Sequence, residues 1–206
     1  DFTDTTQVLD SGGASAGNGV AIDQVNDKSG NGYYAKQTVG VSRPTVTTNI
    51  INGYQAALFD GTNDFFELPT AKPILKNLAG STIVVVHQQT DVTTSHALFY
   101  VQDNTANIRA KLYLLNGANS EWSLNGNRVD GTSGFDLYST SSRVYTVNTW
   151  EIFAARFDWA NALAASWSNG IAKVLSQTFA TSGNTSNTNS LENPTIGSAG
   201  LYGSEV

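Results

Sequence analysis

Short apolar runs separated by polar, glycine-rich turns recur along the whole chain. In the clearest case, the apolar run Ala56 to Phe59 leads into the segment 60–64 (DGTND), and a second apolar run, Phe65 to Leu68, follows. Asp, Asn and Gly tolerate positive φ, and Asp and Asn side chains bond their own backbone. We therefore predict a β-hairpin with its turn at 60–64.

Other runs rich in β-branched and aromatic residues predict further strands. The run Ser81 to His87 holds three consecutive valines, which predicts burial on both faces and a central place in a sheet. The pair Asn169-Gly170 predicts a second hairpin, and Ile74 to Leu78 is the only helical turn that we expect. The segment Asn125 to Ser142 reads as a long connection with at most a brief strand at Arg128-Val129. The remaining strands are expected at Val20–Val25, Tyr33–Val39, Thr45–Ile51, Ala97–Val101, Arg109–Leu115, Glu121–Leu124, Arg143–Val147, Trp150–Asp158, Leu163–Trp167 and Lys173–Phe179.

This spacing of short strands, without a long amphipathic helix, predicts an all-β fold. The expected architecture is an antiparallel β-sandwich of jelly-roll type. A chain of 206 residues is an ordinary length for one all-β domain, and we find no linker or internal repeat. We therefore expect residues 1–206 to form a single domain. Because the chain lacks methionine, Asp1 is not a translation start, and we expect a fragment of a longer protein.

Composition excludes several classes of function. Only 14% of residues are charged and the net charge is −6, so no basic face is available for nucleic acid. The absence of cysteine excludes disulfides, thiolate metal sites and a cysteine nucleophile. No apolar run approaches the roughly 20 residues of a membrane helix, so we expect no membrane insertion.

Four segments together resemble the concanavalin A-like lectin/glucanase superfamily, and most of all its laminin G-like jelly-roll modules, which occur in bacterial surface proteins and in phage tail and capsid appendages. The segments are Val25–Tyr33 with Ala35 and Gln37, Arg43-Pro44-Thr45 with Asn52-Gly53, Leu58-Phe59-Asp60-Gly61 with Asp64-Phe65-Phe66, and Trp150–Phe157 leading to Ser168-Asn169-Gly170. The resemblance implies a jelly roll that binds glycans or surfaces. It also implies one strand ahead of Phe2 and another after Val206, and the sequence holds neither.

Enzymatic chemistry finds little support in the sequence. The glucanases of this superfamily place Glu, Asp and Glu at alternating positions on one strand, and none of the five glutamates here builds that triplet. Glu151 stands on a suitable strand but lacks the partners. No Gly-x-Ser-x-Gly elbow accompanies His87 or His96, which we expect to be packing or surface residues. We expect a non-enzyme, although carboxylates from different strands leave a glycan-cleaving enzyme open as an alternative.

Calcium is the one cofactor that the sequence suggests. Asp60, Asn63 and Asp64 offer oxygen ligands within five residues, which suits the preference of calcium for hard oxygen donors. The resemblance also implies calcium, which is common in the superfamily. The alternative, which we favour, is that Asp60 closes the turn through its own backbone and that Asp64 is a solvated turn residue. The turn around Asp27 is a weaker candidate.

Sugar binding usually needs an exposed aromatic face with polar groups beside it. Candidates for this surface lie in the middle third of the chain: Tyr100, Tyr113, Trp122, Tyr138 and Asn125. Trp122 is the preferred anchor, although a core position is equally compatible with a tryptophan on a strand. Trp150, Trp159 and Trp167 are expected in the core.

We therefore expect a non-catalytic carbohydrate-binding or adhesion module on an extracellular, cell-surface or virion-surface protein. Its partner would be a glycan or cell-surface polysaccharide, and copies on a homo-oligomer would raise weak affinity through avidity. The alternative is a phage capsid or tail decoration domain that contacts other virion proteins without binding sugar.

Overall fold

The computed structural model describes residues 2, 4–90, 96–104, 107–114, 122–126, 135–138, 146–173 and 182–197. Within these, residues 102–104, 107–114, 122–126, 135–138 and 173 are described by their backbone alone. Three sheets form, and all of their paired strands are antiparallel in the described part of the chain. No helix within these ranges is long and apolar enough to cross a membrane.

The largest sheet contains nine strands, in the spatial order β1 (Val8–Leu9), β2 (Gln24–Asn26), β3 (Tyr34–Lys36), β6 (Phe66–Glu67), β15 (Thr195–Ile196), β8 (His96–Asn104), β9 (Asn107–Leu114), β10 (Trp122–Gly126) and β11 (Phe135–Tyr138). The second sheet contains β14 (Ile171–Lys173), β13 (Leu163–Ser168), β12 (Trp150–Asp158) and β7 (Gly80–Gln88). A hairpin of β4 (Thr45–Ile51) and β5 (Tyr54–Leu58) forms the third, and three short 3-10 turns complete the described elements: Thr5–Gln7, Gly40–Ser42 and Trp159–Asn161.

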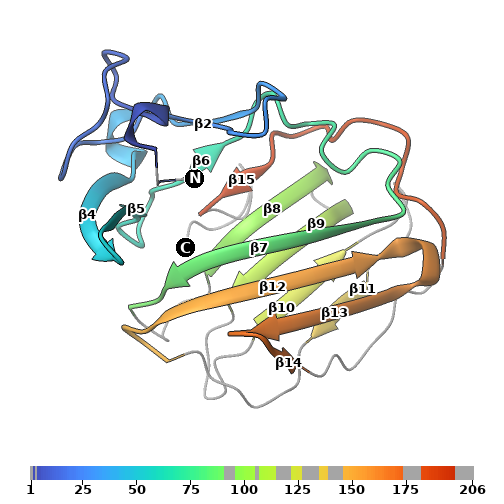
Figure 1. Cartoon of the computed structure of the whole chain (residues 1–206). Helices are drawn as coiled ribbons and strands as arrows, with labels where there is room; N and C mark the ends of the chain where they lie inside the picture. Colours follow the sequence, from blue (N-terminus) through green and yellow to red (C-terminus); the bar gives the residue numbers. More distant parts are fainter. Residues whose placement is uncertain are drawn as a thin grey trace.

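The four-stranded sheet packs in front of β8 to β11, as Figure 1 shows. Strand β12 explains why the two layers adhere, because its residues alternate between the interior and solvent. Phe153, Ala155 and Phe157 are fully buried, whereas Ile152 before them and Arg156 between the last two are exposed. Leu75, Val101 and Trp159 complete this core cluster. The predicted all-β antiparallel sandwich is therefore confirmed.

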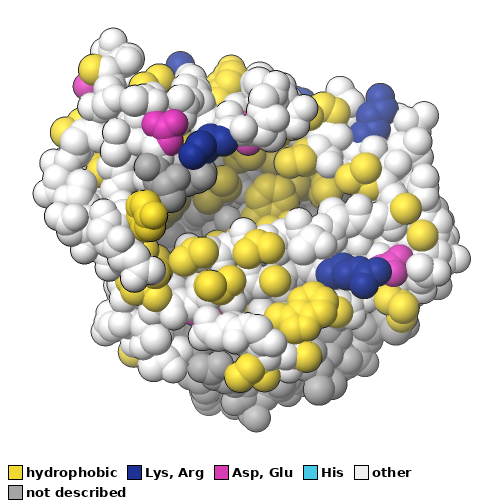
Figure 2. All heavy atoms as spheres, in the orientation of Figure 1, with side chains coloured by type: hydrophobic (Ala, Val, Ile, Leu, Met, Phe, Trp, Pro, Cys, Tyr) yellow, Lys and Arg dark blue, Asp and Glu magenta, His cyan; other side chains and the backbone are white. Residues whose placement is uncertain are grey.

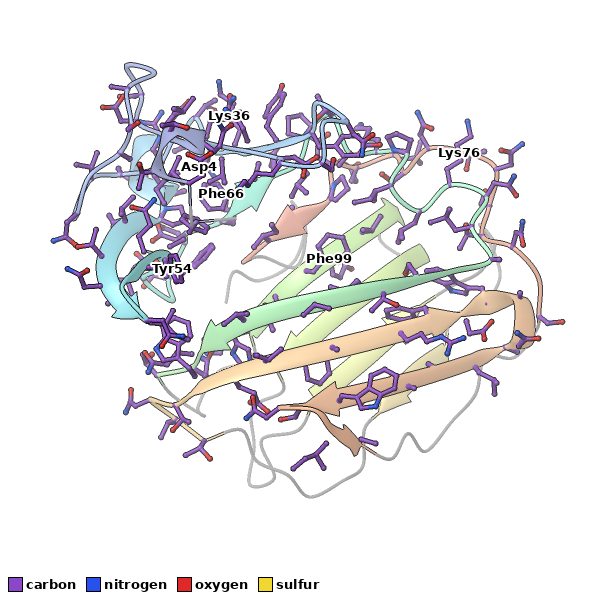
Figure 3. All side chains as sticks on the ribbon, viewed as in Figure 1. Asp4, Lys36, Tyr54, Phe66, Lys76 and Phe99 are labelled. Atoms are coloured by element: carbon purple, nitrogen blue, oxygen red, sulfur yellow. The ribbon has the colours of Figure 1, made fainter. Side chains whose placement is uncertain are left out.

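A second apolar cluster lies at the N-terminal end of the molecule. It comprises Val8, Ala16, Ile22, Val25, Val46 and Phe66, and the β4–β5 hairpin contributes Val46 to it. Phe66, labelled in Figure 3, packs edge to face against the ring of Phe59, and the two ring centroids are 5.8 Å apart. Burial of Phe66 and of β1 and β2 thus anchors the N-terminal segments to the large sheet.

The hairpin predicted at 60–64 is wrong. Strand β5 pairs with β4, while β6 pairs with β3 and β15, so residues 60–64 connect two different sheets. The actual hairpin turn is Asn52-Gly53, whose φ angles of 51° and 80° suit a tight turn between β4 and β5. The hairpin predicted at Asn169-Gly170 is confirmed between β13 and β14.

The burial on both faces predicted for the valine-rich strand is wrong, and among the described strands it is not central. Strand β7 stands at one end of the four-stranded sheet, and its outward-facing Val84 and Val86 are 60% and 53% exposed. Residues 74–78 form hydrogen-bonded turns rather than a helix. Strand β11 falls inside the expected long connection, whereas the brief strand at 128–129 and residues 174–179 lie outside the described residues.

Candidate functional site

The outward face of the four-stranded sheet is the best candidate for a binding surface. The alternation that buries Phe153 turns Ile152, Ala154 and Arg156 outward, and β7 and β13 continue this face on either side. Val86 lies opposite Ile152, and Val84 and Trp167 lie opposite Ala154. Figure 2 shows hydrophobic side chains gathered over β7 and β12. We call this surface, with those residues, the outer face.

Trp167 provides an aromatic ring at the middle of the outer face. Its side chain is half-buried, and the small Ala154 stands opposite it on β12. Arg156 pairs with Ala165, two residues before Trp167, so Arg156 and Trp167 are diagonal neighbours on the same face. Diagonal neighbours are within reach of each other when their side chains are long or aromatic. The sheet therefore places a cationic group beside an accessible indole.

Asp158 fixes the orientation of the arginine. Arg156 Nη2 donates to Asp158 Oδ2 at 3.0 Å, and the Arg156 side chain remains 58% exposed. The other carboxylate oxygen of Asp158 accepts from the backbone N–H and side-chain amide of Asn161, at 3.3 Å and 3.0 Å. We call Trp167, Arg156 and Asp158 the Trp167 platform.

A shallow hollow of about 560 Å³ adjoins the polar end of the Trp167 platform. Thr82, Asn161, Arg156 and Asp158 are among the residues that line it. Gly80 is also part of its lining, and a Cβ there would stand 2.6 Å from the carbonyl oxygen of Phe157. The two strands can approach this closely only because position 80 has no side chain. Hydroxyl, amide, guanidinium and carboxylate groups thus meet around one open recess.

The sequence-predicted sugar-binding residues lie in the other sheet. Tyr100 is only 7% exposed, so its ring is part of the interior. The register pairs Ser123 with both Tyr113 and Tyr138, and Asn125 follows two residues later on the same face. Trp122 is one residue out of phase with these and belongs to the opposite face. The side chains of Tyr113, Trp122, Asn125 and Tyr138 lie outside the described part of the chain.

Two of the three tryptophans predicted for the core are placed differently in the structure. Trp159 is fully buried, and its ring stacks on Phe157 with centroids 5.3 Å apart, as expected. Trp150 and Trp167 instead belong to the outward-facing positions of β12 and β13 and are half-buried. One sequence signal bears on the face on which Trp167 lies, because the Asn169-Gly170 turn sets the register of β13. The serines on either side of Trp167 suggest the opposite face, since serines are usually placed toward solvent and a tryptophan between them toward the core.

One of those serines, Ser168, belongs to a buried polar cluster. Ser168 donates its hydroxyl to Glu151, and both residues are buried. His87 Nε2 lies 3.8 Å from Glu151 Oε2, and burial lowers the pKa of His87 to about 4. His87 is therefore neutral at neutral pH. Glu151, the glutamate on the strand that could carry a catalytic triplet, points into this interior rather than toward a ligand.

The turn at 60–64 is held by its own backbone. Asp60 Oδ1 accepts from the N–H groups of Thr62, Asn63 and Asp64 at 2.8, 3.1 and 3.3 Å. These bonds lower the pKa of Asp60. The solvated position predicted for Asp64 is wrong: it is buried, burial raises its pKa, and it accepts from the N–H of Asp60.

These bonds test how well the turn fits calcium. Asn63 Oδ1 is buried and has no hydrogen-bond partner in the described part of the chain. Among the buried side-chain oxygens of residues 60–64, it alone has no hydrogen bond there. Nowhere in the described ranges do three acidic or histidine side chains gather as a metal group would. Calcium takes six to eight oxygens, so the turn would supply a minority of them, and calcium stays a prediction.

No protein-family model and no curated protein sequence matches this chain. Among solved structures, it is similar to the CBM40 module of the Ruminococcus gnavus IT-sialidase bound to α2,3-sialyllactose, with a TM-score of 0.52, 14% identity, and 92% of this chain and 83% of that chain covered. The same module bound to α2,6-sialyllactose gives a TM-score of 0.49 at 13% identity, with 92% and 83% covered. A chain from a study of ganglioside-dependent cell entry of botulinum neurotoxin type C gives 0.49 at 9% identity, with 84% and 39% covered. The first likeness shows the fold alone, and on that ground the chain has a β-sandwich fold similar to that of the CBM40 module.

Proposed function

We propose that this chain is a non-catalytic carbohydrate-binding or adhesion module and that the Trp167 platform is its binding site. The observation that carries the proposal is a half-buried indole on the outer face, with a guanidinium and a carboxylate that hydrogen-bond to each other on the same face. The similar R. gnavus module was solved with sialyllactose bound, which supports glycans as the ligand class. A location outside the cell, on a cell surface or virion, belongs to the same proposal.

The proposed mechanism follows from the chemistry of the Trp167 platform. The apolar face of a sugar ring stacks on the Trp167 indole, because both surfaces are flat and lose ordered water on contact. Ring hydroxyls then bond to the guanidinium of Arg156 and the carboxylate of Asp158, as charge-assisted hydrogen bonds. The existing bond between these two groups keeps them in place, which reduces the ordering cost of binding.

Calorimetric titration of the chain with sialyllactose, and with lactose as the neutral comparison, tests the proposal. Trp167→Ala should weaken binding about tenfold, because a lost aromatic contact costs about 1.4 kcal/mol. Trp167→Phe should retain most of the affinity. Leu191→Ala is the control, since Leu191 is an apolar residue away from the outer face and 65% exposed. Binding that Trp167→Ala leaves intact would overturn the site.

Trp122→Ala belongs in the same series, because Trp122 is the anchor that the sequence favours. If only this variant loses affinity, the function stands and the site moves to the nine-stranded sheet. If no member of a broad glycan array binds the wild-type chain, the carbohydrate-binding function itself fails.

A second function is favoured by the valines of the outer face. Val84, Val86 and Ile152 are 60%, 53% and 52% exposed and lie side by side. Such a patch suits an apolar protein partner, as a virion decoration domain would have. Ile152→Ser should abolish binding to that partner and leave glycan binding intact. An array without glycan binding, together with self-association that Ile152→Ser removes, would favour this second function.

A further inference from the structure

The Trp167 platform carries one positive and one negative charge, and the two offset each other. Arg156 Nη2 donates to Asp158 Oδ2 at 3.0 Å, so the contact is an ion pair as well as a hydrogen bond. At the outward positions of β7, β12 and β13, three strands that the structure describes in full, these are the only charged residues. Figure 2 shows a basic and an acidic side chain next to each other on this face. The platform therefore offers a ligand no net charge.

The carboxylate of Asp158 has room for one more hydrogen-bond donor. A carboxylate accepts about four hydrogen bonds through its two oxygens. Within the described part of the chain three of these are in use, two from Asn161 to Oδ1 and one from Arg156 to Oδ2. The Asp158 side chain is still 16% exposed, so a ligand can reach it. The remaining position can be filled only by a donor, and a carboxylate on a ligand has none to give.

The guanidinium of Arg156 is the group that an acidic ligand would approach. Arginine binds a carboxylate most strongly when two parallel N–H groups meet its two oxygens. Because Nη2 already donates to Asp158, a ligand carboxylate on the same guanidinium would lie close to a like charge. The net charge of −6 on the whole chain repels anions as well. An acid group on a ligand therefore meets more repulsion than attraction at this site.

A sugar hydroxyl, in contrast, fits both charged groups at once. Its oxygen accepts from the guanidinium and its hydrogen is donated to the carboxylate. Trp167 lies diagonally beside Arg156 on the same face, so a sugar ring stacked on the indole presents its edge hydroxyls to the ion pair. The adjoining hollow, with Thr82 and Asn161 in its lining, adds a hydroxyl and an amide. Its volume of about 560 Å³ lies within the range of small-molecule sites, about 300–1,000 Å³, and leaves space for a second sugar unit.

We propose that the Trp167 platform selects neutral hexoses and that Asp158 is the residue that excludes acidic sugars. This inference rests on the proposed function, because it assigns the ligand class of the same site. The hexose stacks on Trp167, one of its hydroxyls bridges Arg156 and Asp158, and the next sugar unit occupies the hollow. A uronic or sialic acid in the same position binds more weakly, because its carboxylate faces Asp158. Sialyllactose, the ligand of the similar R. gnavus module, is thus the acidic comparison rather than the expected best ligand.

An array of neutral oligosaccharides beside acidic counterparts tests the ligand class. Its pairs include lactose with sialyllactose and galactobiose with digalacturonic acid, and calorimetry then measures the pairs that bind. We expect the neutral member to bind about tenfold more tightly, which is within the range that Coulomb repulsion gives near a protein surface. Equal or tighter binding of the acidic members, lost in Trp167→Ala, would overturn the inference and leave the proposed function standing. An array on which nothing binds would overturn both.

Asp158→Asn tests the excluding residue itself. Asparagine keeps a side-chain oxygen for the Asn161 bonds and removes only the charge, so the turn after β12 should be retained. Sialyllactose should then bind at least as tightly as lactose, and this gain should shrink when salt is raised from about 0.05 to about 0.5 M, because salt screens the attraction to the guanidinium. Asp27→Asn, in the turn between β2 and β3, is the matched control for the same change in net charge and should keep the wild-type preference. An unchanged preference in Asp158→Asn would contradict the role of this carboxylate.

Discussion

The turn at 60–64 allows a quantitative test of what Asp60 does. Asp60→Ala removes one carboxylate oxygen that accepts three backbone N–H groups. The arrangement resembles a helix N-cap, for which the same change costs about 1–2 kcal/mol. Because the Asp60 side chain is largely exposed, water replaces part of the lost hydrogen bonding. We therefore expect Asp60→Ala to lower the free energy of unfolding by about 1 kcal/mol. In a domain of this size, that corresponds to a fall in Tm of about 2–4 °C.

The pH dependence of the stability loss shows how much of it comes from the negative charge of Asp60 and how much from its hydrogen-bond geometry. The backbone N–H groups lower the folded-state pKa of Asp60 below its usual value of 3.8. The stabilisation is therefore complete above the unfolded-state pKa and is lost as the pH falls through the lower, folded-state pKa. Asp60→Asn keeps an acceptor but no charge, so it should lose less stability than Asp60→Ala and lack this acid-dependent part.

Urea unfolding followed by circular dichroism, at pH 7 and between pH 4 and 2, measures both quantities. Glu192→Gln, which removes a carboxylate outside any described turn bond, is the control. The same samples with calcium or with a chelator test the metal prediction, because a ligand that binds only the folded state raises its stability. A difference below about 0.3 kcal/mol between Asp60→Ala and wild type would refute the turn argument, and a calcium-dependent Tm abolished by Asp60→Ala would assign Asp60 to a metal site.

Three further predictions follow from the described contacts. Gly197→Ala should destabilise the chain by about 1–3 kcal/mol in urea unfolding, because φ is 89° and a Cβ would stand 2.6 Å from the ring of Phe59; an unchanged midpoint would contradict this. Arg43→Met should cost about 2–3 kcal/mol by the same assay, since Arg43 meets Asp23 at 2.5 Å with both side chains only 15% exposed; a neutral effect would show that the pair adds nothing. The folded-state pKa of His87, about 4, lies below the unfolded value of 6.5, so its stabilising share is complete above 6.5 and is lost as the pH falls toward 4; His87→Gln should flatten this slope, and a His87 ring that titrates near 6.5 by NMR would refute it.

Much of the fold could be predicted because period-two patterns and Asn-Gly turns are local signals. The bounds of β4 and β12 agree with the sequence-based expectation at both ends. The Asn169-Gly170 turn could be predicted because Asn and Gly tolerate positive φ, and both residues adopt positive φ in the structure. Strands β5 and β6 do not pair with each other, because β5 pairs with β4 and β6 pairs with β15. A turn motif alone does not contain that information.

The candidate site was harder to predict because the burial pattern of β13 is the reverse of the usual one. On β13, serines face the interior and Trp167 faces outward, contrary to the usual amphipathic pattern. The inversion depends on Glu151, which needs Ser168 as a hydrogen-bond donor inside the core. A buried polar cluster drawn from different strands has no local signature. The same limit applies to β7, whose valines predict a central strand while its described partners leave one side open.

The proposed binding site can be tested directly by NMR, because the four tryptophan indole N–H signals can be assigned with single Trp→Phe variants. During titration with the best-binding glycan, the Trp167 signal should shift progressively while the signal of the buried Trp159 stays fixed. A shift confined to Trp122, or no shift in any indole signal while calorimetry reports binding, would contradict the assignment of the site to the outer face.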